Sequence, residues 1–139
     1  EHEDTHLLSL PWGLSIGFLQ EGLAEYMAGE RKWHNKEPGF FIKKCFKENI
    51  MPPFQNLMSH KNWINLPDEN MPYYYITSAS FVKFLIENFG KEKFFKLYKS
   101  TSRKNNIKKN IKIFKDTYKI SIDEAEKKWK TKINFAIKI

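Results

Sequence analysis

The chain has a single cysteine, Cys45, among its 139 residues. One cysteine excludes an internal disulfide and a zinc site built from several cysteines, but it leaves the cellular compartment open. No run approaches the eighteen or more apolar residues of a membrane-spanning helix, so we expect no membrane segment in this chain. Strand-like alternation of apolar and polar residues is lacking, and so is any internal repeat. These absences favour one all-α domain over residues 1–139.

The residues that are present support a helical core. Apolar residues make up 41% of the chain and aromatic residues 16%, enough to fill the interior of one domain. Gly29 and Gly90 suit helix ends, and Pro38 suits a first turn. Residues 54–72 lack a clear period and are predicted to be a long surface loop with one short helix near its start. Apolar residues at helical spacing predict helices over residues 17–29, 38–48, 73–89, 91–100, about 107–118, and from 121 towards the end.

The net charge of +8 raises the question of a phosphate-bearing partner. The excess is mostly lysine in a chain also rich in isoleucine and asparagine, a bias typical of AT-rich coding. Aromatic residues follow core spacing and do not alternate with the basic ones. We therefore expect no nucleic-acid partner, with a basic helical module that binds nucleic acid kept as the weaker alternative. The lysines at 108, 109, 112 and 115 are interpreted as one solvated helix face.

The first six residues contain a chemically specific pattern, His2-Glu3-Asp4-Thr5-His6. On a helix, His2 and His6 share a face one turn apart, so both imidazoles can bind one metal ion. Glu3 lies one position round and can hold the metal's water without binding the metal, which is the physical basis of the H-E-x-x-H motif. The pattern predicts zinc ligands at His2 and His6 and a general base at Glu3, with one protein ligand still to be found.

Two acidic residues, Glu21 and Glu25, follow after fourteen intervening residues, in the run EGLAEY. At 100° per residue they lie about 40° apart on a helix, and apolar residues hold the opposite side. One interpretation is an amphipathic helix with a wet acidic face. The other is that the acidic face meets the two histidines.

A helical hairpin would bring the two blocks together. The connection between them contains turn residues, and Gly22 and Ala24 are small enough to let a neighbouring helix approach closely. In that arrangement Glu21 supplies the third zinc ligand. Glu25 accepts the second N–H of His2 and so holds the imidazole in its metal-binding tautomer.

HEDTH followed by FLQEGLAEYM resembles the gluzincin peptidases, in particular the bacterial peptidase-MA-like group, whose pattern reads HExxH, a spacer and then W-L-x-E-G-x-A-E-Y. The resemblance continues in residues 73–93. Here the family's pattern has tyrosine and small residues, followed by F-V-x-F-L and then F/Y-G-x-E-K. Residues 119–124 and Trp129 match a closing G-I-S-x-x-E and W. Two positions depart from the pattern: Phe18 stands where tryptophan is usual, and Lys119 where glycine is common.

The resemblance implies a zinc-dependent peptidase that acts on peptide or protein substrates. Gluzincins commonly carry an acidic residue four positions after the glutamate ligand, which matches Glu25. The chain then represents the helical subdomain, with the sheet half of the enzyme upstream of residue 1. Because the chain opens without Met one residue before His2, we expect the native protein to extend upstream, where a signal peptide or anchor would lie. Export and surface anchoring both stay open, and residues 1–139 alone are expected to be poorly active.

Two questions stay open at the level of sequence. An oxyanion needs a donor besides the metal, and the candidates are Tyr73, Tyr74, Tyr75, His34 and His60. A catalytically inactive peptidase-like domain that only binds its partner is the main alternative function. The intact general base at Glu3 argues against that alternative.

Overall fold

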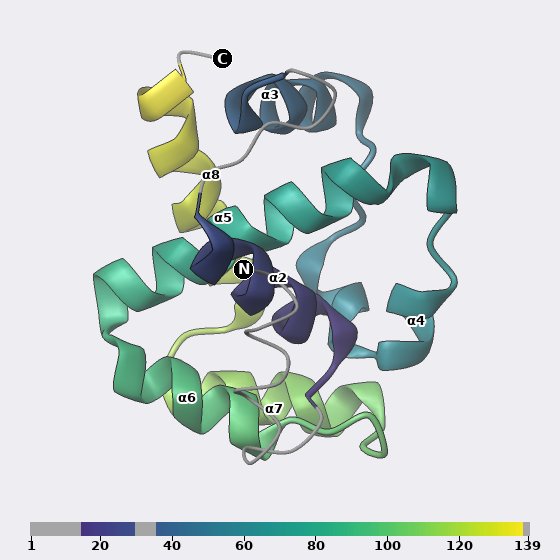
Figure 1. Cartoon of the computed structure of the whole chain (residues 1–139). Helices are drawn as coiled ribbons and strands as arrows, with labels where there is room; N and C mark the ends of the chain where they lie inside the picture. Colours follow the sequence, from purple (N-terminus) through teal and green to yellow (C-terminus); the bar gives the residue numbers. More distant parts are fainter. Residues whose placement is uncertain (1–14, 30–35, 138–139) are drawn as a thin grey trace.

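The computed structural model describes residues 15–29 and 36–137, with side chains described up to Asn134. No strand occurs in these residues, which confirms the all-α class (Figure 1). No helix among them is long and apolar enough to span a membrane. The elements are α2 (Gly17–Ala28), α3 (Pro38–Glu48), η2 (Phe54–Met58, a 3-10 helix), α4 (His60–Ile64), η3 (Asp68–Asn70, also 3-10), α5 (Met71–Phe89), α6 (Lys91–Ser100), α7 (Ile107–Tyr118) and α8 (Ile122–Ile137).

Helix α5 is the element on which the others pack. α2, α3, α6 and α8 contact it, and α7 packs against α6 and α8 (Figure 1). Phe81 of α5 is fully buried, and its ring centroid lies 4.6 Å from that of Phe54, 5.9 Å from Phe18 and 6.4 Å from Phe114. Aromatic pairs at 4.5–7 Å add to the stability gained from burial alone. The core is therefore an aromatic cluster that joins segments from the whole described chain.

The ends of the helices follow local signals. Gly29 and Gly90 close α2 and α5 with φ of 83° and 92°, values that favour glycine. The Ser121 hydroxyl accepts a hydrogen bond from the Glu124 N–H at 3.1 Å and so caps α8. Helix α5 begins at Met71, two residues before its predicted start, because Pro72 fits the first turn.

The prediction of a surface loop over residues 54–72 is wrong at its start, where the expected short helix is present as η2 but is buried, whereas residues 61–71 are mostly exposed. Phe54, Leu57 and Met58 of η2 are 0–1% exposed and belong to the core. The Phe54 N–H donates to the Glu126 carboxylate of α8 at 2.8 Å, which ties the start of η2 to the last helix. A five-residue element is too short to show a period, so its burial depends on partners distant in sequence.

Candidate functional site

Of the two sequence blocks that predict the metal centre, the structure describes only the second, which contains Glu21 and Glu25. Glu21 and Glu25 lie on α2. His2, Glu3 and His6 lie outside the described residues, as does the oxyanion candidate His34. The structure thus bears on the acidic half of the predicted site, and the imidazole half stays a prediction.

The acidic pair on α2 is not a solvated face. Glu21 is partly buried, and Glu25 is only 4% exposed, one turn further along the same helix. Burying a carboxylate costs several kcal/mol unless hydrogen bonds or an opposite charge compensate. The interpretation of a wet acidic helix face is therefore wrong for Glu25, which needs a donor or cation beside it.

Helix α2 is held against α5 at Gly22. A Cβ built at this position would lie 2.8 Å from Val82 Cγ2 and 2.9 Å from the Ser78 carbonyl oxygen, so only glycine allows this crossing without a shift. Ala24, the other small residue of the block, is fully buried. The predicted hairpin has the histidine-bearing helix as the neighbour of these small residues, but at Gly22 the neighbour is α5, and the hairpin stays a prediction. The crossing fixes the position of the helix that bears the two carboxylates.

The start of α2 is fixed by side chains that the sequence did not single out for this role. The Gly17 N–H has no acceptor within the helix, because it lies in the first turn of α2, and it donates to His60 Nδ1 at 2.9 Å. The indole of Trp63 packs directly on Gly17, since a Cβ there would lie 2.2 Å from Trp63 Cδ1. Arg103 donates from Nε to the Ser15 carbonyl at 2.9 Å and from Nη2 to Gln20 Oε1 at 2.8 Å. These partners lie more than forty residues away in sequence, so no local pattern could identify them.

The state of His60 follows from this contact. Because Nδ1 accepts a hydrogen bond, the ring is neutral and its proton lies on Nε2. Burial lowers the pKa of His60 below its usual 6.5, and the nearby Arg103 guanidinium lowers it further. At neutral pH the imidazole is therefore a stable cap for α2.

The tyrosine candidates differ in their surroundings. Tyr74 is buried, and its hydroxyl accepts a hydrogen bond from Asn70 at 3.4 Å. Tyr73 lies under the Lys44 ammonium of α3, which is 5.6 Å from its ring centroid. Tyr75 is only partly buried and stacks on Trp63, with 6.1 Å between the ring centroids and an angle of 11° between the ring planes. Tyr74 also contacts Trp63, with 6.5 Å between the ring centroids. Trp63 therefore links both Tyr74 and Tyr75 to the start of α2 at Gly17, one turn before Glu21.

The described residues contain no other group of metal ligands, and comparisons with known proteins point to no other site. Within residues 15–29 and 36–137, no three His, Cys, Asp or Glu side chains lie close enough together to hold a metal ion. Three of the five residues of the predicted centre, His2, Glu3 and His6, lie outside those residues. Comparisons with protein-family models, with curated proteins and with solved structures found no match.

Proposed function

We propose that this chain is the helical part of a zinc-dependent peptidase in which His2, His6 and Glu21 hold the metal. The proposal rests on the two sequence blocks, H-E-x-x-H and E-G-L-A-E-Y, taken together. The observation that adds most to it is the burial of Glu25 one turn after Glu21 on a helix fixed at both Gly17 and Gly22. A merely solubilising acidic face would not bury a carboxylate.

The donor set suits zinc. Two imidazole nitrogens and one carboxylate oxygen are a common protein ligand set of catalytic zinc, which keeps its fourth position for water. When bound, zinc lowers the pKa of its water to about 7, which makes hydroxide available at neutral pH. The Glu3 carboxylate would take the proton from that water and pass it to the leaving amine.

Glu25 would act on a ligand and not on the metal. Its buried carboxylate would accept the second ring N–H of His2, which fixes the tautomer and orientation of the imidazole. The same hydrogen bond would compensate the cost of burying the carboxylate. This role accounts for the acidic residue four positions after Glu21.

Two of the oxyanion candidates suit the geometry better than the others. Tyr75 and His60 both lie by the start of α2, through Trp63 and Gly17 respectively. Tyr74 also contacts Trp63, but it is buried and its hydroxyl accepts from Asn70, and Tyr73 lies at Lys44. Tyr75 carries a hydroxyl donor, and neutral His60 carries its donor on Nε2. Donors of this kind stabilise charge that develops in the transition state.

The test is metal content and casein hydrolysis of the protein beside its Glu3→Gln variant, with Asp4→Asn as a matched control in the same block. Glu3→Gln should keep about one zinc and lower turnover about 10²-fold or more, as expected for loss of a general base. Asp4→Asn should retain turnover. Unchanged turnover in Glu3→Gln would overturn the assignment, and zinc binding without hydrolysis in the unmodified protein would favour the inactive binding domain instead.

A further inference from the structure

The positive charge of this protein is concentrated in one segment. Residues 91–119 contain eleven Lys and Arg against two Asp and Glu, so they carry a net charge of +9. The total is +8, and the remaining 110 residues therefore carry −1. A coding bias towards lysine acts on the whole chain and does not explain such a division.

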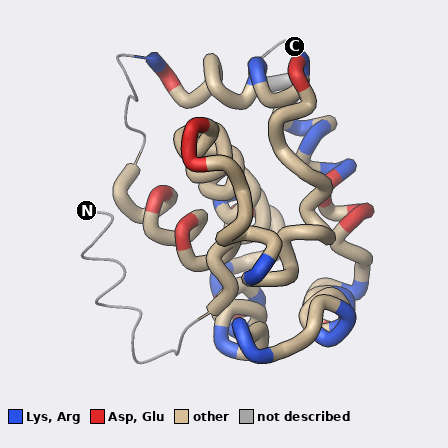
Figure 2. The backbone as a smooth tube through the Cα atoms, turned by 90° about the vertical axis from the view of Figure 1, so that its right-hand side faces the viewer, with Lys and Arg blue, Asp and Glu red and all other residues tan. Residues whose placement is uncertain are grey.

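The segment forms one two-helix unit, α6 and α7, with its loop. Its apolar side faces the core, where Phe94, Leu97 and Phe114 are fully buried. All of its basic residues are exposed: Lys91, Lys93, Lys96, Lys99, Arg103, Lys104, Lys108, Lys109, Lys112, Lys115 and Lys119. Figure 2 shows Lys and Arg gathered at the bottom of the molecule, whereas the right side carries both basic and acidic residues and the acidic turns of α2 lie at the left. We call these exposed residues the basic face.

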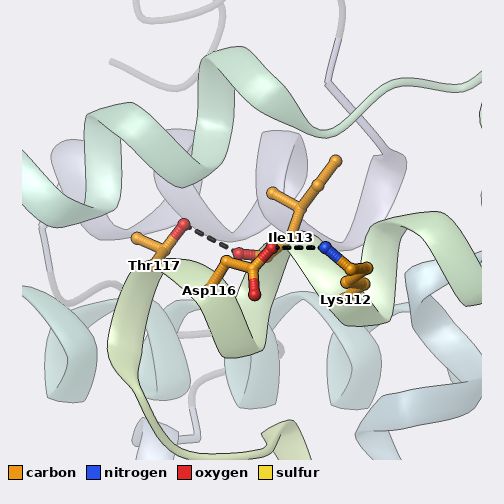
Figure 3. A network of polar contacts seen from close by, with 4 residues as sticks. All are labelled: Lys112, Ile113, Asp116 and Thr117. Atoms are coloured by element: carbon orange, nitrogen blue, oxygen red, sulfur yellow. Dashed lines mark hydrogen bonds and ion pairs between the residues drawn. The ribbon is translucent and has the colours of Figure 1, made fainter.

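Little of this charge is neutralised within the protein. In the described part of the chain, the ion pair of the segment joins Lys112 to Asp116 at 3.0 Å (Figure 3). Both side chains are mostly exposed, at 77% and 61%, so the pair is strongly screened. Clustered like charges on a surface repel one another, and an anionic partner removes that repulsion.

We propose that the basic face docks the protein on a membrane surface rich in anionic phospholipid. Ten of its eleven basic residues are lysines, which attract headgroup phosphates as point charges, whereas specific recognition of nucleic acid favours the forked arginine side chain. The one arginine, Arg103, already binds Ser15 and Gln20.

The lack of large exposed hydrophobic residues on the basic face also favours a headgroup layer over a nucleic acid. The large exposed hydrophobic residues of the described chain are Met27, Phe40, Ile64 and Met71, and none belongs to residues 91–119. No aromatic platform is therefore available there to stack on the bases of a single strand. An attraction that acts through lysine charge alone suits a headgroup layer, is reversible, and weakens steeply with salt. The docking proposal does not depend on the proposed peptidase activity.

The test is sedimentation of the protein with vesicles of phosphatidylcholine, with and without about one third phosphatidylglycerol. One variant carries glutamine at Lys96, Lys99, Lys108 and Lys109 of the basic face. A matched control removes the same charge elsewhere, at Lys43, Lys47, Lys61 and Lys127, all of which are exposed. Glutamine and lysine have similar helix propensities, and circular dichroism checks that both variants fold.

We expect binding to the anionic vesicles alone, lost between low and high salt. Each lysine near the surface changes partitioning about fivefold, so the basic-face variant should bind about 10²–10³-fold more weakly, and the control should bind within about fivefold of the unmodified protein. Equal losses in both variants would show that net charge and not this face is responsible, and would overturn the proposal. No binding to anionic vesicles, or tighter binding to duplex DNA at the same salt concentration, would overturn it as well.

Discussion

Replacing Gly22 by alanine should destabilise the protein, because this residue sets the distance between α2 and α5. The new Cβ would meet Val82 Cγ2 at 2.8 Å and the Ser78 carbonyl oxygen at 2.9 Å, whereas ordinary contacts begin at 3.4 Å. The valine methyl can rotate away, but the carbonyl belongs to the backbone of α5. The two helices must therefore separate by roughly half an ångström.

The magnitude is a difference between two effects. Overpacking in a close contact costs about 1–3 kcal/mol, and alanine regains about 0.5–1 kcal/mol over glycine in a helix interior. The net loss is therefore about 0–2.5 kcal/mol, with about 1 kcal/mol expected. For a chain of this size that corresponds to a fall of up to about 10 °C in the melting temperature. Because α2 carries Glu21 and Glu25, the same shift should weaken the proposed zinc binding.

Thermal and urea unfolding of Gly22→Ala would measure the effect, with Met27→Ala as the control. Met27 lies on the same helix but is 59% exposed, so its replacement should change stability by less than about 0.5 kcal/mol. Adding Val82→Ala to Gly22→Ala should relieve only part of the clash, since the Ser78 carbonyl remains. A Gly22→Ala variant more stable than the unmodified protein would refute the close crossing of α2 and α5.

Two further predictions concern stability. The pKa of His60 is lowered in the folded state, so the unfolded chain takes up a proton at this residue first as the pH falls. The contribution of neutral His60 to the free energy of unfolding is therefore fully present above pH 6.5 and is lost as the pH falls from there through the lowered pKa. His60→Gln keeps an acceptor for Gly17 without titrating, and its urea midpoint measured between pH 5 and 7 should lack this step; identical pH profiles would contradict the cap. Lys119 ends α7 with a φ of 64°, so Lys119→Gly should raise the free energy of unfolding by about 0.5–1 kcal/mol. Asn49→Gly should gain less at its φ of 50°, because asparagine tolerates this conformation, and a destabilised Lys119→Gly would be inconsistent with the strain.

The sequence was most informative where structure depends on neighbouring residues. The predicted helix over residues 38–48 is α3 from Pro38 to Glu48, and residues 107–118 form α7, because caps and helical spacing act within a few residues. In the gluzincin pattern that the sequence resembles, glycine is common where Lys119 stands. The backbone at Lys119 has a positive φ of 64°, the conformation that glycine prefers.

Long-range contacts were beyond sequence reasoning. His60 and Arg103 hold the start of α2 across 43 and 88 residues, and nothing in their local sequence marks them for this role. The same holds for η2, whose burial depends on Glu126 and Trp129 of α8. A local pattern predicts a helix and its apolar face, but the partner of that face is decided by the packing of the whole chain.

The candidate site divides in the same way. Helical spacing correctly placed Glu21 and Glu25 on one helix, and the structure adds that Glu25 is buried. Burial could not be predicted, since the same spacing also fits a wet surface helix. The roles of His2, Glu3 and His6 stay predictions, because these residues lie outside the described part of the chain.

The central claim is that the two carboxylates of α2 serve one zinc ion in different ways, and zinc titration against a competing chelator tests it most directly. Glu21→Gln should lose zinc almost completely, because it removes a metal bond. Glu25→Gln should bind about 10–100-fold more weakly and refill with excess zinc, because glutamine can still accept a hydrogen bond from His2. Glu87→Gln, an exposed position on α5, should match the unmodified protein, which is expected to bind about one zinc. If Glu21→Gln and Glu25→Gln both bind zinc as tightly as the unmodified protein, the metal centre is not built on this helix.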